Sequence, residues 1–318
     1  MGSDSQAVAF LFPGQGSQEV GMGKELAAHF PIAARVFEEA DAIVGFALSR
    51  LCWEGPAEEL NDTINTQPAL LCHSVAALRV LESVRPELRA TWLAGHSLGE
   101  FSALVAAGAM NFPDALRLVR TRGEAMKAAG VRSPGGMAAV LGLELEAVEA
   151  ACAAAQAATG EAVQVANDNC PGQLVISGSK PALTAAVERL RASGARRVVE
   201  LAVSIAAHSA LMEPAQSELN RAIESTPISA PAIPVIGNVN AAVLGSVADI
   251  REELRSQLTS RVRWTETVRS MLEAGVTNFI ELGTRDVLSN LVRRIDRQVS
   301  TAAAGDPTGI GSLASRKR

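Results

Sequence analysis

A serine between two glycines is the feature of this sequence that points most directly to chemistry. The segment GHSLG places Ser97 between Gly95 and Gly99. The apolar run at 91–94 is typical of a buried strand, and residues 100–110 are typical of a helix. In a G-x-S-x-G turn the serine lies at a strand-to-helix corner, where glycines avoid a Cβ clash. We therefore interpret Ser97 as a nucleophile at such a corner; the alternative is a small residue in an ordinary tight bend.

A serine hydroxyl is a weak nucleophile until a base removes its proton, and four histidines compete for that role. His29 and His73 fall in helical patterns before the serine, and the side chain of His96 should diverge from that of its neighbour Ser97. His208 is the only histidine that follows the serine, which is the chain order of elbow enzymes. The residues leave open whether His208 is the base or merely begins the helix that follows it.

No acidic partner for the histidine stands out. Asp114, Asp168 and Asp286 are all candidates. A Ser-His-Asp triad and a Ser-His dyad, in which a backbone carbonyl holds the imidazole, therefore both remain open.

The glycine-rich segment FPGQGSQEVGMGK (12–24) does not fit a phosphate-binding loop. Glu19 stands where G-x-G-x-x-G needs glycine, and Met22 stands where a P-loop needs lysine. A glycine-lined turn after a strand can instead aim the backbone N–H of Gln15 at a developing oxyanion, together with the N–H of Leu98. The alternative is an ordinary turn.

Three further polar residues are unremarkable when each is taken alone. Arg122 in RTRGEAM is typical of a solvated helical arginine. Asn167, shortly before Pro171, is typical of a turn, and Gln257 is typical of a polar residue near a helix end.

Composition excludes several classes of function. A net charge of −5 and the lack of long basic runs argue against nucleic acid as a ligand. No apolar run reaches the roughly 18 residues of a membrane span, so we expect no membrane segment. The four cysteines form no C-x-x-C pair, and with four histidines they offer little for a zinc site. We expect no metal, and reduced thiols in a cytoplasmic protein.

The two ends of the chain differ from the rest. The first six residues, MGSDSQ, have neither the charged nor the apolar part of a secretory signal and resemble an expression remnant. Residues 301–318 are small and polar with no periodic apolar pattern, so we predict a disordered tail.

The order of elements predicts an α/β fold with an insertion. Before residue 133 we expect one strand at 7–12, another at 91–94, and helices at 24–44, 67–81, 100–110 and 113–129. The order then becomes β-α-β-β-α-β, a ferredoxin-like unit at 133–202. The α/β pattern resumes with helices near 209–225, 249–258 and 287–297 and strands near 233–239 and 276–282. We therefore predict a mostly parallel sheet domain formed by 1–132 and 203–300, interrupted by the insertion.

Taken together, these motifs resemble the malonyl-CoA:acyl-carrier-protein transacylase family, the acyltransferases of fatty acid and polyketide biosynthesis. The resemblance covers nearly the whole chain, in the ordered segments FLFPGQGSQEVGMG, GHSLGE, RTRGEAM, GGMAAVLG, NDNCPGQLVISG, AAHSALM, SQLTSRVRWTETV and FIELGTRDVL. It implies an α/β-hydrolase-like domain with a ferredoxin-like subdomain, which agrees with the order of elements above.

The resemblance also implies a role for each candidate residue. Ser97 becomes the acyl-accepting nucleophile and His208 its base. Gln15 and Leu98 become backbone oxyanion donors, and Arg122 becomes the partner of the malonyl carboxylate.

Two further roles come from the same resemblance. Gln257 falls where the family orients the histidine through a main-chain carbonyl, and Asn167 falls where a side chain assists near the acyl group or the histidine. The implied substrates are malonyl-CoA and acyl carrier protein, with no cofactor, and we expect a monomer. The segment SIAAH before the histidine has alanine where many relatives carry a phenylalanine that narrows the acyl pocket.

Two other functions compete with a ping-pong malonyltransferase. A serine hydrolase or thioesterase would use the same Ser-His pair but would not need a cation in the acyl pocket. A non-enzymatic docking module would not need every catalytic position filled. For carrier docking, two arginine clusters are candidates: Arg191, Arg196 and Arg197, and Arg261 with Arg263.

Overall fold

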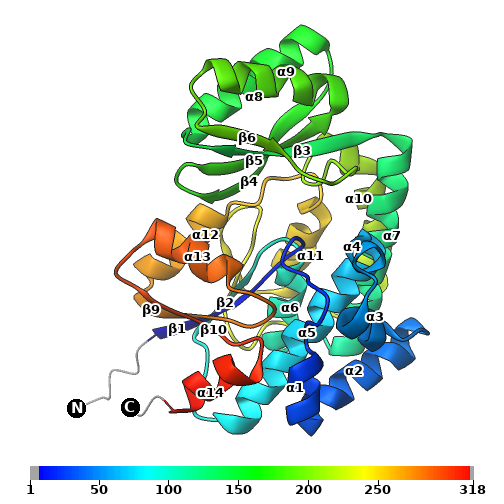
Figure 1. The fold of residues 1–318 in the computed structure, drawn as a ribbon, viewed down its shortest axis with the longest axis vertical. Coiled ribbons are helices and arrows are strands. Elements are labelled where there is room, and N and C mark those ends of the chain that lie inside the picture. Colours follow the sequence, from blue (N-terminus) through cyan, green and yellow to red (C-terminus); the bar gives the residue numbers. More distant parts are fainter. Residues whose placement is uncertain (1–6, 316–318) are drawn as a thin grey trace.

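The computed structural model describes residues 7–315, which form a large α/β part and a smaller antiparallel part (Figure 1). The α/β fold with a parallel sheet, predicted from the sequence, is confirmed. The proposed expression remnant, MGSDSQ, and residues 316–318 of the predicted tail lie outside the described residues.

The large sheet has the strand order β10-β9-β1-β2-β7-β8, and its strands are parallel except for the β7–β8 pair. Its strands are β1 (Ala7–Phe12), β2 (Trp92–Gly95), β7 (Val235–Ile236), β8 (Val243–Leu244), β9 (Val276–Glu281) and β10 (Ser300–Ala303). β1 lies in the middle and is apolar throughout, because both of its faces are covered.

Helices cover both faces of this sheet. The helices of the large part are α1 (Lys24–His29), α2 (Pro31–Val44), α3 (Leu48–Glu54), α4 (Ala57–Asn61), α5 (Thr63–Val84), α6 (Gly99–Ala106), α7 (Phe112–Arg132), α10 (Glu213–Ser225), α11 (Val247–Ser256), α12 (Trp264–Glu273), α13 (Val287–Ile295) and α14 (Pro307–Ser315), with a 3-10 turn at Ala210–Met212. The predicted helix at 24–44 is two helices, because Phe30 is extended before Pro31.

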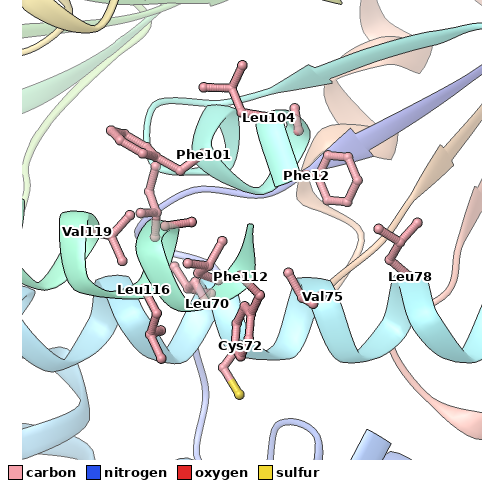
Figure 2. Packing of buried hydrophobic residues seen from close by; sticks show 14 of the residues in the cluster. Phe12, Leu70, Cys72, Val75, Leu78, Phe101, Leu104, Phe112, Leu116 and Val119 are labelled. Atoms are coloured by element: carbon pink, nitrogen blue, oxygen red, sulfur yellow. The ribbon is translucent and has the colours of Figure 1, made fainter. Parts of the chain in front are cut away.

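Alternate residues of β1 enter two different cores. Phe10 and Phe12 pack with residues of α5, α6 and α7, whereas Ala9 and Leu11 pack with residues of α12 and α13. Figure 2 shows part of the first core, to which α6 contributes Phe101 and Leu104 and to which α5 and α7 contribute further apolar side chains. This packing fixes α6, and with it the turn before α6, against the sheet.

The smaller part is an antiparallel sheet of order β4-β5-β3-β6 with two helices packed against it (Figure 1). Its elements are β3 (Gly135–Leu141), α8 (Leu145–Thr159), β4 (Val163–Cys170), β5 (Gln173–Ser179), α9 (Lys180–Ala192) and β6 (Arg197–Glu200). The order β-α-β-β-α-β is that of a ferredoxin-like unit. We keep 133–202 as the proposed bounds of this subdomain.

The prediction of a disordered tail is wrong for residues 301–315. Residues 300–303 form β10, which pairs in parallel with β9, and α14 buries Ile310 and Leu313. Composition suggested disorder because this segment has few apolar residues. Its order depends on a strand edge supplied by residues 276–281, which composition does not reveal.

No helix within residues 7–315 is long and apolar enough to cross a membrane.

Candidate active site

Ser97 lies at the corner between β2 and α6 with a left-handed backbone, φ 52°. A Cβ on Gly95 would lie 1.9 Å from the carbonyl carbon of Gly99, and a Cβ on Gly99 would lie 1.9 Å from the carbonyl oxygen of Phe12. Both flanking glycines are therefore sterically required. A positive φ costs a non-glycine residue about 1–2 kcal/mol, so the surroundings must hold Ser97 in this conformation.

The structure brings Ser97 and His208 together. Oγ of Ser97 is 2.8 Å from Nε2 of His208. On the other side of the ring, Nδ1 lies 2.9 Å from the carbonyl oxygen of Gln257 and 3.1 Å from that of Ser260. Carbonyl oxygens only accept, so Nδ1 carries the hydrogen and Nε2 is free to take the serine proton.

This geometry corresponds to a dyad with a backbone-held imidazole. No hydrogen bond joins His208 to Asp114, Asp168 or Asp286 in the described part of the chain. Burial, and then the positive charge of Arg122, lower the pKa of His208 to about 3. The imidazole is therefore neutral at neutral pH and able to accept a proton.

Arg122 is a buried cation beside Ser97, with only 1% of its surface exposed. Its Nη2 donates to Ser97 Oγ at 3.1 Å and to Gln257 Oε1 at 2.9 Å, and its Nη1 donates to Gln67 Oε1 at 2.8 Å. Burial lowers the pKa of this guanidinium to about 10, which leaves it charged at neutral pH. Within residues 7–315 it forms no salt bridge with a carboxylate.

The loop that contains Gln15 packs against the elbow. A Cβ on Gly14 would lie 2.2 Å from the carbonyl oxygen of His96. Leu98 is the N-cap of α6, and in the part of the chain described here neither its N–H nor that of Gln15 donates to another protein group. The N–H of Ser97 itself donates to Oδ1 of Asn238 at 2.6 Å. The N–H groups of Gln15 and Leu98 therefore remain available to a ligand oxygen.

Asn167 lies on β4 and is buried, but the described residues show no hydrogen bond from its side chain to Ser97 or His208. Gln164 of the same strand supports the histidine instead, since its Nε2 donates to the His208 carbonyl at 3.1 Å and to that of Thr259 at 3.2 Å.

Sequence reasoning missed Gln164, and also Gln67 and Asn238. Gln67 belongs to α5 and Asn238 follows β7, and none of the three stands in a pattern that marks it out. Only the packing of separate segments brings these amides to the site.

Among the described residues no cluster of three or more His, Cys, Asp or Glu side chains could hold a metal ion. A serine hydroxyl bonded to a neutral imidazole, two unpaired backbone N–H groups and a buried cation together suit acyl transfer through a serine ester. The fold and the site thus define a class, the α/β enzymes of acyl transfer.

Comparison with known proteins agrees with this class: residues 9–309 match the family described as "Acyl transferase domain". The chain belongs to the acyl transferase family, which confirms the resemblance seen in the sequence. It is 47% identical over 305 residues to the malonyl CoA-acyl carrier protein transacylase of Bacillus subtilis (strain 168), covering 95% of each chain.

Solved structures agree. The malonyl CoA-acyl carrier protein transacylase from Coxiella burnetii superposes with a TM-score of 0.94 at 38% identity, over 98% of each chain. A malonyl-transacylase solved in complex with a type II PKS acyl-carrier protein also gives a TM-score of 0.94, at 41% identity, over 98% of this chain and 100% of that one.

Proposed function

We propose that this protein transfers a malonyl group from malonyl-CoA to the phosphopantetheine thiol of acyl carrier protein, by a ping-pong mechanism through an ester on Ser97. The relatives described above carry this activity in their names. We further propose that it acts in the cytoplasm; the four buried cysteines, all free, suit a reducing compartment.

One observation carries the proposal: the hydroxyl of Ser97 lies within hydrogen-bond distance of both a neutral imidazole and a buried guanidinium. A buried cation without an ionic partner favours an anionic acyl group, because a carboxylate supplies the missing charge. A planar guanidinium can hold that carboxylate through two parallel hydrogen bonds. This matches a malonyl thioester better than a neutral acyl group.

In the first half-reaction, Oγ of Ser97 attacks the thioester carbonyl of malonyl-CoA while Nε2 of His208 takes the hydroxyl proton. The carbonyl oxygen becomes an oxyanion that the N–H groups of Gln15 and Leu98 stabilise. When the C–S bond breaks, His208 returns the proton to the CoA sulfur and the malonyl group remains as an ester on Ser97.

The second half-reaction runs the same steps with a different thiol. The pantetheine thiol gives its proton to His208 and its sulfur attacks the ester carbonyl; the C–O bond then breaks and Oγ of Ser97 regains the proton. Carrier proteins of fatty acid and polyketide synthesis present the same thiol, so the chemistry at Ser97 is the same for both. The carbonyl oxygens of Gln257 and Ser260 hold the imidazole in one orientation throughout.

The alternative, a serine hydrolase or thioesterase, releases the acyl group to water. Labelled malonyl-CoA should give a stoichiometric adduct by intact-protein mass spectrometry, which persists until carrier protein is added and then passes to the carrier. Ser97→Ala should form no adduct, whereas Ser102→Ala, which changes a buried serine elsewhere on α6, should behave as the parent. Rapid loss of label to free malonate without carrier would favour the hydrolase.

A further inference from the structure

The side chain of Asn238 joins the two sides of the nucleophile turn. Its Nδ2 donates to the carbonyl oxygen of Gly95 at 2.8 Å, and its Oδ1 accepts from the N–H of Ser97 at 2.6 Å. Asn238 is fully buried and follows β7, which pairs with β2 directly before the turn. The side-chain amide of one residue that follows the neighbouring strand therefore bonds to the backbone on both sides of His96.

These two hydrogen bonds stabilise the unfavourable backbone conformation of Ser97. The φ of 52° is disfavoured for a residue with a Cβ, so fixed partners must hold it. Asn238 satisfies one donor and one acceptor that the turn would otherwise leave buried and unpaired. It also occupies the N–H of Ser97, which leaves the N–H of Leu98 as the elbow's donor for an oxyanion.

Two buried carboxyl groups hold Asn238 in turn. Oε1 of Glu253 accepts from the N–H of Asn238 and of Val239, both at 2.7 Å, and Oε2 of Glu100 accepts from the N–H of Asn238 at 3.0 Å. A Cβ on Gly237 would lie 2.6 Å from Oε2 of Glu253, so the glycine permits this approach. Glu100 is the last residue of the GHSLGE motif, which links the motif to Asn238.

The two carboxyl groups influence each other's ionisation. Burial, and then the neighbouring Glu253, raise the pKa of Glu100 well above its ordinary value. Ionising both groups would place two buried negative charges next to each other, so the pair favours a state in which one carboxyl group carries a proton.

We propose that Asn238 is a positioning residue that holds Ser97 in its reactive backbone conformation, and that Glu100 and Glu253 hold Asn238. This inference rests on the proposed role of Ser97 as the acyl acceptor. It assigns no contact with substrate to Asn238, which acts through the backbone of the turn.

The test measures the rate of self-acylation by malonyl-CoA in rapid mixing, normalised to the final amount of adduct. Asn238→Ala should acylate on the order of 10- to 100-fold more slowly, because a displacement of about 1 Å at a reacting group has effects of this size. Its preference for malonyl over acetyl thioester should be unchanged, since Arg122 is untouched. Asn238→Ser, too short to bridge both groups, serves in place of Asn238→Ala if that variant does not fold.

Two sets of controls separate positioning from general stability. Asn111→Ala removes the side chain that caps α7 and should lower stability without changing the normalised rate. Glu100→Gln preserves both an acceptor and a donor and should retain the parental rate, whereas Glu100→Ala should be slowed like Asn238→Ala.

Parental normalised rates in both Asn238 variants would overturn the proposal, as would equal loss in Glu100→Gln and Glu100→Ala. An adduct on Ser97→Ala would instead overturn the proposed function, so the two failures are distinguishable.

Discussion

The imidazole of His208 is held by the carbonyl oxygen of Gln257, 2.9 Å from Nδ1, at the place where a triad would have a carboxylate. A neutral acceptor holds the ring without adding negative charge. This suits the proposed binding of an anionic acyl group next to Arg122, because a carboxylate partner of the histidine would compete for the guanidinium.

His208→Ala should slow acylation by roughly 10²- to 10⁴-fold, the usual cost of losing a general base. Gln257→Ala should be milder, since its carbonyl remains and only the amide that contacts Arg122 and the Ser97 carbonyl is lost. Single-turnover acylation rates measure both. Activity of His208→Ala within a few-fold of the parent would remove the histidine from the mechanism.

The stability of the folded protein should depend on pH through His208. Its pKa is about 3 in the folded chain and about 6.5 when unfolded, so between these values the unfolded chain binds the extra proton. This contribution is complete above pH 6.5 and is lost as the pH falls toward 3, by up to about 1.4 kcal/mol per pH unit. His73 and His96 also have lowered pKa values through burial.

The difference between parent and His208→Gln isolates this one group. Urea unfolding at several pH values between 4 and 8 should give a parent curve that falls more steeply with acid than the variant curve. Parallel curves would mean that His208 titrates normally in the folded state.

Arg122→Ala should separate malonyl from acetyl transfer. Removing the partner of a buried carboxylate costs on the order of 3–5 kcal/mol, or roughly 10²- to 10³-fold in malonyl kcat/KM. An acetyl thioester has no carboxylate to lose, so its transfer should be spared. Arg120→Ala is the matched control, because Arg120 lies on the same helix and is paired with Glu124. It should leave kcat/KM unchanged for both substrates. An equal fall for both esters in Arg122→Ala would make that arginine structural.

Gly99→Ala should prevent correct folding of the turn, because the added Cβ would lie 1.9 Å from the Phe12 carbonyl oxygen. We expect loss of soluble protein or a large fall in the unfolding midpoint. Gly311→Ala in α14 has nothing within 4 Å of its Cβ and should be neutral or stabilising by up to about 1 kcal/mol. Thermal unfolding of the two variants compares them; a parental midpoint for Gly99→Ala would contradict the steric argument.

Carrier docking should depend on Arg191, Arg196 and Arg197 more than on Arg261 and Arg263. The first three are exposed and form no salt bridge in the described part of the chain. The last two are already paired, with Glu149 at 2.6 Å and Glu266 at 3.1 Å. Because the positive charges of the first cluster are not neutralised by a carboxylate of this chain, their electrostatic potential can attract an acidic partner.

Charge reversal of the first cluster should raise the KM for carrier protein and weaken its salt dependence, while the half-reaction with malonyl-CoA is unchanged. Charge reversal of the second cluster serves as the comparison and should affect the KM for carrier protein less. Unchanged carrier kinetics for the first cluster would end this hypothesis.

How far sequence alone predicts the site varies from residue to residue. Ser97 was recognisable because the corner has room only for glycine two residues before it and two residues after it. The family resemblance pointed to the Gln257 carbonyl as a partner of the histidine. The support from Gln164 was not recognisable, because Asn167 and Gln164 lie on one strand and look equally ordinary in the sequence. The C-terminal segment shows the same limit of sequence reasoning. Residues 300–303 are ordered because they pair with β9, and nothing in their local sequence reveals that pairing.

The sequence by itself determined the local elements, the elbow with its glycines, and the family to which the chain belongs. These depend on short-range sterics, apolar periodicity and ordered motifs, all of which are written along the chain. The family resemblance pointed to the Gln257 carbonyl as the partner of His208. Only the tertiary structure decided that the Ser260 carbonyl joins it, that Arg122 has no salt-bridge partner within residues 7–315, and that Asn238 bonds to both sides of the turn. The hydrogen bonds of the His208 and Asn238 side chains join residues that are 49 to 143 positions apart, and bonds over such separations follow from how helices and strands pack.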